Sequence, residues 1–248
     1  MNLCSCSNLK LLNVSASPLG SFSPAVATWY GSAHGAGSGG GACGYGPGVG
    51  QPPYSAMVSA GNANLFKSGK GCGSCYQVKC TQNAACSRNP VTVTITDECP
   101  GSCNDELFHF DLSGKAFGAM AKPGQDGKLR SAGKLNIQYQ KVPCNYPGVK
   151  VAFRVGSGSN PNFFACAIEY EDGDGDLALV ELHAASSNQW LPMQQSWGAT
   201  WKINLSPATK APFSIRLTTV ESRKSIVANN VIPTGWSPGQ TYRSVVNF

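Results

Sequence analysis

The chain has 248 residues, of which only 13% are charged, and it contains 29 glycines and 16 prolines. This turn-rich composition is typical of an all-β protein with many short strands rather than of a helical one. The net charge is +6, but no basic run is interleaved with aromatic residues, which argues against a nucleic-acid partner and favours an acidic polymer matrix. No stretch approaches the roughly 18 apolar residues of a membrane span, so no transmembrane segment is expected.

Cysteine usage indicates an oxidising compartment. Eight of the 11 cysteines lie between Cys43 and Cys144, a density that is typical of a disulfide framework. A redox role for Cys72-Gly73-Ser74-Cys75 would need a βαβ context, and a zinc site would need a second close pair of ligands. The sequence offers neither, so we predict disulfides and no metal.

We interpret residues 1–27 as a leader or processed segment. The segment contains Lys10 and the glycosylation sequon Asn13-Val14-Ser15. Ala25-Val26-Ala27 resembles a small-residue cleavage site, although no apolar run of signal-peptide length precedes it. The cysteine usage nevertheless predicts a secreted, extracellular protein.

Residues 28–148 form the first predicted domain. A glycine-dense loop covers residues 35–50. It lacks the Gly-Lys-Ser/Thr and the helix that a phosphate-binding loop requires, so we predict a tight loop pinned by disulfides. Four strands are predicted after the loop, at Ser74–Lys79, Val91–Asp97, Phe108–Leu112 and in the alternating run that starts at Leu135. A short helix is predicted at Ser113–Ala121.

The run from Leu107 to Gly114 is the strongest candidate for a functional site. Alternate residues of a strand face opposite ways, so Phe108, Phe110 and Leu112 should anchor one face while His109 and Asp111 project together from the other. Asp97 is a second carboxylate, delivered from the end of another strand. The alternative interpretation is a buried Asp that only satisfies backbone N–H groups, because perturbed acids mark sites only probabilistically.

Asn145-Tyr146-Pro147-Gly148 marks the predicted domain boundary, and residues 149–248 form the second domain. Short alternating runs separated by turn residues predict a β-sandwich, which we interpret as a binding module. Asp172-Gly173-Asp174-Gly175-Asp176 could indicate calcium, but the Glu that ends a calcium loop is absent, and a hairpin turn is favoured.

Several motifs together resemble the plant expansins. In chain order, they are Thr28-Trp29-Tyr30-Gly31, Gly40–Tyr45, Cys72–Tyr76, Thr96–Cys99 and His109–Asp111. Ala116–Ala121, Val142–Gly148 and Tyr170–Asp176 resemble the β-expansin branch, which includes the grass pollen group-1 allergens. The resemblance spans about residues 25–248. It implies a six-stranded double-psi β-barrel similar to family-45 endoglucanases, followed by an immunoglobulin-like β-sandwich that binds polysaccharide.

The resemblance also implies a function and a covalent framework. Expansins loosen plant cell walls by weakening noncovalent contacts between cellulose and matrix glycans. The partners would be cellulose and arabinoxylan-type glycans, with no cofactor, and the protein would be a monomer in the cell wall. The family disulfides would be Cys43–Cys72, Cys75–Cys144 and Cys80–Cys86. Cys99–Cys103 is a further prediction from the spacing alone, and Cys4, Cys6 and Cys166 have no obvious partner.

A hydrolytic base is missing from the sequence. Inverting glycoside hydrolysis needs an acid and a base about 6.5–9.5 Å apart. Asp111 matches the hydrolase acid and Asp97 a position that supports it, but the first 96 residues, which should supply the base, contain no Asp or Glu. Ser38 stands where many β-expansins carry an Asp. We therefore predict no hydrolase, with a weak endoglucanase or transglycosylase, or a barwin-like carbohydrate-binding or defence protein, as the alternatives.

Flat aromatic rings are the predicted contacts with polysaccharide. By the family resemblance, Trp197 and Phe163 match exposed positions of the sandwich, and Trp29 matches one beside the barrel groove, with Thr28, Tyr30 and Ser38 as further contacts. Trp197 and Trp201 share a face by parity, so Trp197 can be exposed only if Gly198 permits a bulge. Three other tryptophans are predicted to be core or domain-junction residues, because large apolar side chains usually go inside: Trp190, Trp201 and Trp236.

Overall fold

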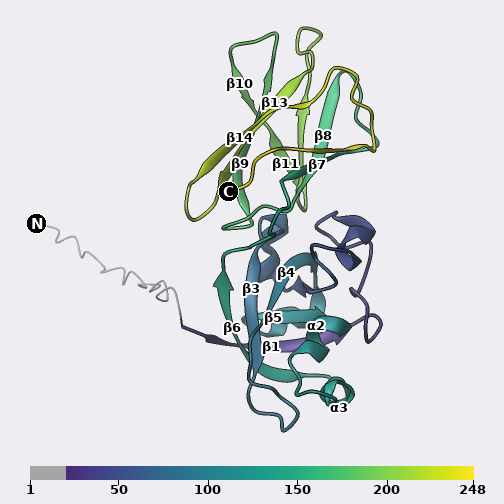
Figure 1. The fold of residues 1–248 in the computed structure, drawn as a ribbon, viewed down its shortest axis with the longest axis vertical. Helices are drawn as coiled ribbons and strands as arrows, with labels where there is room; N and C mark the ends of the chain where they lie inside the picture. Colours follow the sequence, from purple (N-terminus) through teal and green to yellow (C-terminus); the bar gives the residue numbers. More distant parts are fainter. Residues whose placement is uncertain (1–20) are drawn as a thin grey trace, which may run out of the picture.

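The computed structural model describes residues 21–248, which form a barrel and a sandwich stacked end to end (Figure 1). The barrel contains the earlier part of the chain, and the sandwich contains the later part. None of the helices in residues 21–248 is long and apolar enough to cross a membrane. The predicted Asn13 sequon, Cys4 and Cys6 lie outside the described residues.

Six strands close the barrel in the order β1-β5-β2-β4-β3-β6. Their bounds are β1 Ser23–Tyr30, β2 Val58–Gly61, β3 Cys75–Cys80, β4 Val91–Glu98, β5 His109–Ser113 and β6 Leu135–Val142. The β1–β5 and β2–β4 pairs are parallel and the others antiparallel. Short helical turns fill the connections: η1 Gly46–Gly50, α1 Ala63–Phe66, η2 Lys67–Gly69, η3 Gly101–Asp105, α2 Gly114–Ala119 and α3 Asp126–Ser131. The predicted all-β barrel is confirmed.

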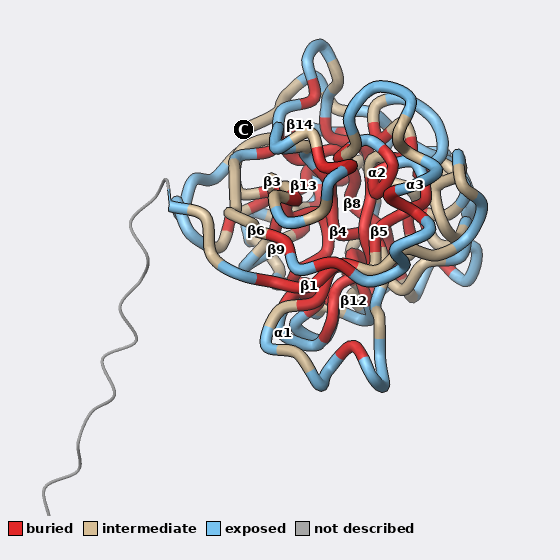
Figure 2. Tube along the Cα trace, turned by 90° about the horizontal axis from the view of Figure 1, so that it is seen from below, coloured by how far each residue is buried: buried red, intermediate tan, exposed pale blue. Residues whose placement is uncertain are grey.

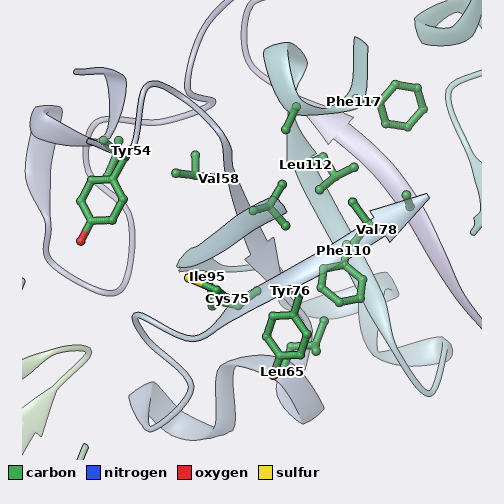
Figure 3. Packing of buried hydrophobic residues seen from close by; sticks show 14 of the residues in the cluster. Tyr54, Val58, Leu65, Cys75, Tyr76, Val78, Ile95, Phe110, Leu112 and Phe117 are labelled. Atoms are coloured by element: carbon green, nitrogen blue, oxygen red, sulfur yellow. The ribbon is translucent and has the colours of Figure 1, made fainter. Parts of the chain in front are cut away.

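The barrel core forms because alternate strand residues turn inward. Phe110 and Leu112 of β5 are fully buried, and they pack with residues from the other strands (Figure 3). Buried residues concentrate along β1, β4 and β5, whereas the connecting loops are mostly exposed (Figure 2). Helix α2 begins directly after β5, where the Ser113 hydroxyl accepts a hydrogen bond from the Ala116 N–H at 3.0 Å and caps the helix.

The first strand corrects the predicted leader boundary. β1 begins at Ser23, and Ala25, Val26 and Ala27 are buried in the barrel wall between β5 and β6. Their small size serves close packing between strands, which produces the same sequence pattern as a cleavage site. The barrel therefore starts at least five residues before the predicted boundary at residue 28.

Two antiparallel sheets form the sandwich. One has the order β10-β9-β13-β14 and the other β11-β12-β8-β7-β15. The bounds are β7 Ala152–Val155, β8 Phe163–Glu169, β9 Leu177–Ala184, β10 Trp190–Pro192, β11 Gln194–Trp197, β12 Thr200–Asn204, β13 Phe213–Thr219, β14 Ser225–Ile232 and β15 Thr241–Arg243. Phe153, Phe164, Ile168, Leu182 and Ile215 fill the space between the sheets. The predicted sandwich is confirmed.

Four disulfides stabilise the barrel. Cys43–Cys72, Cys75–Cys144 and Cys80–Cys86 join as predicted, and Cys99–Cys103 closes the turn after β4. Cys166 is a free thiol buried in the sandwich core, where burial raises its pKa to about 12. This thiol is therefore protonated and inert at ordinary pH.

The acidic run from Asp172 to Asp176 joins the two halves of the molecule. The Asp172 carboxylate accepts a hydrogen bond from the Tyr146 N–H at 2.6 Å, and Asp174 accepts from two backbone N–H groups of the β13–β14 turn. Asp176 accepts from Ser74 and from Lys141, both at 3.0 Å. These carboxylates are thus occupied by protein donors. The predicted hairpin turn is corrected, because the run connects β8 of one sheet to β9 of the other and is a loop that crosses between the sheets.

Candidate polysaccharide site

The register of four strands places the predicted polar residues in one row. Thr28 of β1 pairs with Asp111 of β5, Asp111 pairs with Ala60 of β2, and Ala60 pairs with Asp97 of β4. Neighbouring strands lie about 4.8 Å apart, so the sheet brings together side chains that are far apart in the sequence. This row is the centre of the candidate site.

A chain of short hydrogen bonds links three of these residues. The Thr28 hydroxyl donates to Asp111 Oδ1 at 2.6 Å, and Thr28 Oγ1 lies 2.8 Å from His109 Nε2. Because the hydroxyl has only one hydrogen, His109 Nε2 must be the donor whenever Asp111 is ionised. The Nδ1 atom of His109 is buried and has no partner among the described residues. A neutral imidazole protonated on Nε2 satisfies this geometry.

Burial shifts both titratable groups toward their neutral forms. Burial raises the pKa of the Asp111 carboxyl, although the Thr28 hydrogen bond and His109 oppose the shift and Asp97 adds to it. Burial likewise lowers the pKa of His109, against the attraction of Asp111. His109 is only 5% exposed, whereas Asp111 is half-buried and can reach a ligand. The raised pKa and the partial exposure of Asp111 thus favour a carboxyl group that can donate a proton or a hydrogen bond to a ligand.

Asp97 holds a loop instead of facing solvent freely. Its Oδ1 accepts from the Ala42 N–H at 2.6 Å and from the Glu98 N–H at 2.8 Å, and its Oδ2 accepts from the Tyr30 hydroxyl at 3.4 Å. Gly41 lies so close to Thr96 and Asp97 that a Cβ atom would lie 2.6 Å from the Thr96 carbonyl oxygen. Burial, followed by the charges of Asp97 and Asp111, raises the pKa of Tyr30, so this phenol stays protonated.

Ser38 lies beside this cluster. Its hydroxyl accepts a hydrogen bond from the Gly40 N–H at 3.1 Å, and the neighbouring Gly37 packs on the Tyr30 ring. Ser38 therefore has a loop-ordering contact and carries no charge into the site.

The same loop leads to the sandwich. The Ala199 N–H donates to the Cys43 carbonyl at 3.0 Å, and the Trp197 ring lies against Gly44. Arg154 donates a hydrogen bond to the Gly44 carbonyl and pairs with Glu169. Asp97 holds Ala42, so the same short segment, Ala42 to Gly44, contacts both the polar row and the sandwich at Trp197.

Trp197 is 55% exposed, and a bulge makes this exposure possible. The register of β11 with β12 shifts between Gln195 and Trp197, and Gly198 adopts φ +51°. Trp197 consequently pairs with Thr200 on the outer face, while Trp201 points inward and is buried. Glycine favours this left-handed conformation because it has no Cβ. The backbone geometry matches the bulge that exposure requires.

Phe163 lies on the same outer face. It pairs with Asn204, while its neighbour Phe164 enters the core. Trp197 is paired with Thr200 and Phe163 with Asn204, and these two positions of β12 are four residues, or roughly 13 Å, apart along the strand. Lys202 lies on the outer face between them and could have been identified from the same alternation. The half-buried Phe163 ring and the exposed Trp197 ring thus mark two ends of one strip.

Trp29 faces away from the polar row. Strand alternation turns it opposite to Thr28 and Tyr30, its Nε1–H donates to the Arg130 carbonyl at 3.0 Å, and its ring packs near Phe117. The predicted set is corrected on this point, because Trp29 anchors the α2–α3 region.

The remaining tryptophans differ from one another. Trp201 is core as predicted, and Trp236 is partly buried against the sandwich core. Trp190 is neither core nor junction, because it stacks with His183 and Arg216 on the outer face of the other sheet. The stack against His183 and Arg216, which come from neighbouring strands, covers part of the Trp190 ring. The sequence alone does not indicate this stack.

Comparison with known proteins agrees with this architecture. The family profile described as expansin C-terminal domain matches residues 151–233, and one described as lytic transglycolase matches residues 58–139. A crystal structure of the expansin from Clavibacter michiganensis superposes with a TM-score of 0.69 at 24% identity, covering 92% of this chain and 98% of that one. A mutant of that bacterial protein in complex with cellohexaose superposes equally well. The fold is thus that of the two-domain expansins.

Plant relatives identify the branch. Expansin-B11 of Oryza sativa subsp. japonica is 59% identical over 227 residues, which cover 90% of this chain and 77% of that protein. Expansin-B4 of Arabidopsis thaliana is 55% identical over 222 residues, covering 89% and 85%. The chain belongs to the plant β-expansin family.

Proposed function

We propose that this protein is secreted to the plant cell wall as a monomer and loosens the wall by disrupting noncovalent contacts between cellulose and matrix glycans, most of all xylans. Support comes from its membership of the β-expansins and from the cellohexaose complex of the bacterial expansin, which has the same fold. No cofactor is part of the proposal.

One observation carries the non-hydrolytic part of the proposal. Strand β1 and the loop after it bring Thr28, Tyr30 and Ser38 toward the row that contains Asp111, but residues 1–96 contain no carboxylate that could activate water. Glycoside hydrolysis by inversion needs such a base on the opposite side of the sugar. Asp111 can then protonate or hydrogen-bond a glycan oxygen without completing bond cleavage.

The alternative is a weak endoglucanase or transglycosylase, and Asp97 is the residue that favours it. Asp97 is a second carboxylate in the same row as Asp111. However, its Oδ1 already accepts two backbone N–H bonds and its Oδ2 faces Tyr30. Asp97 acts, in our proposal, as the anchor of the loop that joins the barrel surface to Trp197.

We further propose that the polysaccharide lies along the surface from the polar row, across Gly44, to Trp197 and Phe163. Aromatic rings cover the apolar C–H faces of sugars, and polar side chains at the edges bond their hydroxyl groups. Lys202 and Gln194, paired across β11 and β12 beside Trp197, supply such polar groups.

A creep assay on heat-killed grass walls tests the proposal. The protein should extend clamped wall strips while no reducing ends are released and no labelled acceptor oligosaccharide is incorporated. Released oligosaccharides would favour the endoglucanase, and labelled transfer products would favour the transglycosylase. Binding without extension would leave only a carbohydrate-binding module.

A further inference from the structure

A pocket of about 840 Å³ opens at the end of the sandwich that lies away from the barrel. Three loops form it: residues 159–162 before β8, residues 205–211 after β12, and residues 234–238 before β15. The opposite end of β12 carries Ala199, which contacts the barrel. The pocket is therefore separate from the polar row around Asp111.

The surface exposed inside the pocket is mostly apolar. Pro161, Pro207 and Pro238 line it, together with the half-buried ring of Trp236. The Trp236 ring is fixed because it meets Phe164 edge-on at 5.5 Å between ring centroids. Proline and tryptophan faces of this kind can stack on a flat aromatic ring.

The loops are held in place before any ligand binds. The Leu205 N–H donates to the Asn162 carbonyl at 2.8 Å, which joins the first two loops. The Ser206 and Thr209 hydroxyl groups lie 2.8 Å apart, and the Ser237 N–H donates to the Tyr242 hydroxyl at 2.9 Å. A preformed pocket loses little conformational entropy on binding.

The charge at the pocket favours a ligand that carries a hydrogen-bond acceptor or a negative charge. Lys210 lines it and takes part in none of the ion pairs found within residues 21–248. No Asp or Glu is among its lining residues in the described part of the chain. A ligand that combines an aromatic ring with a carboxylate or ester carbonyl therefore matches both the walls and the charge.

The position and the volume of the pocket indicate what the aromatic group of the ligand is attached to. Asn160 exchanges two backbone hydrogen bonds with Phe163, at 2.8 and 3.0 Å, so the pocket begins where the strip of Trp197 and Phe163 ends. A volume of about 840 Å³ exceeds the needs of a single ring and leaves space for an attached sugar. We infer that this pocket binds an aromatic acyl ester on a matrix glycan whose backbone lies along the strip. The placement of the glycan backbone along the strip rests on the proposed function. The placement of the aromatic ring rests on the pocket alone.

Indole N–H signals in a nitrogen–proton NMR spectrum of the full chain test the inference. The probes are trans-cinnamate, cinnamyl alcohol, xylotriose and a cinnamoyl ester of xylotriose. The Trp236 signal should shift with cinnamate and with the ester, and the ester should bind about tenfold more tightly than xylotriose. Lys210→Gln should weaken cinnamate binding about fivefold and leave cinnamyl alcohol unchanged.

Two variants distinguish binding in the pocket from nonspecific binding to exposed aromatic residues. Trp236→Leu should remove the advantage of the ester over xylotriose, whereas the matched control Trp190→Leu, on the other sheet, should keep it. Because Trp236 contacts the core, the Lys210→Gln result and the wild-type shifts test the inference even if Trp236→Leu misfolds. An unshifted Trp236 signal, or indole signals that all move together, would overturn the inference.

Different experimental outcomes would contradict the glycan-borne origin of the aromatic ring and the proposed function. Tight binding of free cinnamate with no advantage for the ester would overturn the glycan-borne source and leave a free aromatic acid as ligand. Absence of wall extension combined with a shifted Trp236 signal would contradict the proposed function while supporting the pocket.

Discussion

At the scale of single residues, the contacts of Asp111 determine what this site can do. The carboxyl is half-buried beside His109, and the Thr28 hydroxyl donates to it at 2.6 Å. Burial favours the protonated acid, and the hydrogen bond favours the ionised form, with burial the larger effect. Asp111 therefore carries a proton to higher pH than an ordinary aspartate does.

We expect Asp111→Asn to abolish wall extension while leaving the fold intact. Asparagine keeps the shape and the oxygen that accepts from Thr28, but it cannot give up a proton. Creep rates on heat-killed walls should fall to the buffer level, and the melting temperature should change by only a few degrees.

The pH profile provides the control for this prediction. Wild-type creep should decline as pH rises through the raised pKa of Asp111, because the acid then ionises. Glu98→Gln, which changes an exposed neighbouring carboxylate, should leave the profile unchanged. A folded Asp111→Asn protein with full creep activity would rule out the role of Asp111 as acid.

At the scale of elements, strand parity and one bulge determine which aromatic rings face solvent. Trp197 and Trp201 would share a face in a regular strand pair, but the shift beside Gly198 turns Trp197 outward. In β1 the same alternation turns Trp29 inward, against Phe117 and the Arg130 carbonyl. One local irregularity thus decides whether a tryptophan can contact a ligand.

We expect Trp197→Ala to weaken binding to cellulose or wall residue by roughly tenfold, since half of the ring can cover a sugar for about 1–2 kcal/mol. Depletion assays would measure the affinity, and calorimetry would show a nearly unchanged melting temperature. Trp190→Ala is the matched control because Trp190 lies on the opposite sheet. Loss of stability with unchanged binding per folded molecule would instead make Trp197 a structural residue.

At the scale of the whole molecule, the junction between barrel and sandwich contains a buried acid. Glu171 is 4% exposed and lies near Glu169 and Asp176, and burial raises its pKa to about 8. Lys141 reaches the neighbouring Asp176 at 3.0 Å and Glu221 at 2.8 Å. Protonation of Glu171 keeps an uncompensated charge out of the junction.

Stability should therefore decrease with rising pH. Glu171 is ionised above about pH 4.5 in the unfolded chain but only above about pH 8 in the folded protein. Between these values the folded state binds more protons, so the free energy of unfolding falls as pH rises and levels off above the folded pKa. Glu171→Gln should flatten this decline and stabilise the protein at pH 8 by about 2–4 kcal/mol.

Denaturant titrations at pH 5 and pH 8 would measure this effect, with Glu98→Gln as a control that retains the decline. An equal decline in Glu171→Gln and wild type would place the pH-sensitive group elsewhere.

Reduction of the disulfides should unfold the barrel while the sandwich remains folded. The four disulfides within residues 21–248 lie in the barrel or at its end, and each bridge typically contributes about 2–4 kcal/mol. Under reductant, hydrogen exchange should become fast in β3 and β4 but remain slow in β8 and β13, whose core needs no bridge. Simultaneous loss of protection in both halves would show that the junction makes them one cooperative unit.

The sequence by itself determined several of the elements, the disulfides and the residues of the polar row, but not strands β1 and β2. Alternation and turn residues are local properties, so β4, β5, β12 and α2 could be predicted within a few residues. The motifs around Cys43, Asp97 and Asp111 identified the family, and with it the bridges Cys43–Cys72, Cys75–Cys144 and Cys80–Cys86.

Only the tertiary structure decided which side chains meet. The burial of Ala25–Ala27, the hydrogen bond of Trp29 to the Arg130 carbonyl and the stack of Trp190 on Arg216 depend on neighbours from other elements. The same holds for the contact of Trp197 with Gly44 and for the pocket beside Trp236, which joins three loops. Register and loop packing set these positions through long-range contacts, and a local pattern contains no information about residues that lie a hundred positions away.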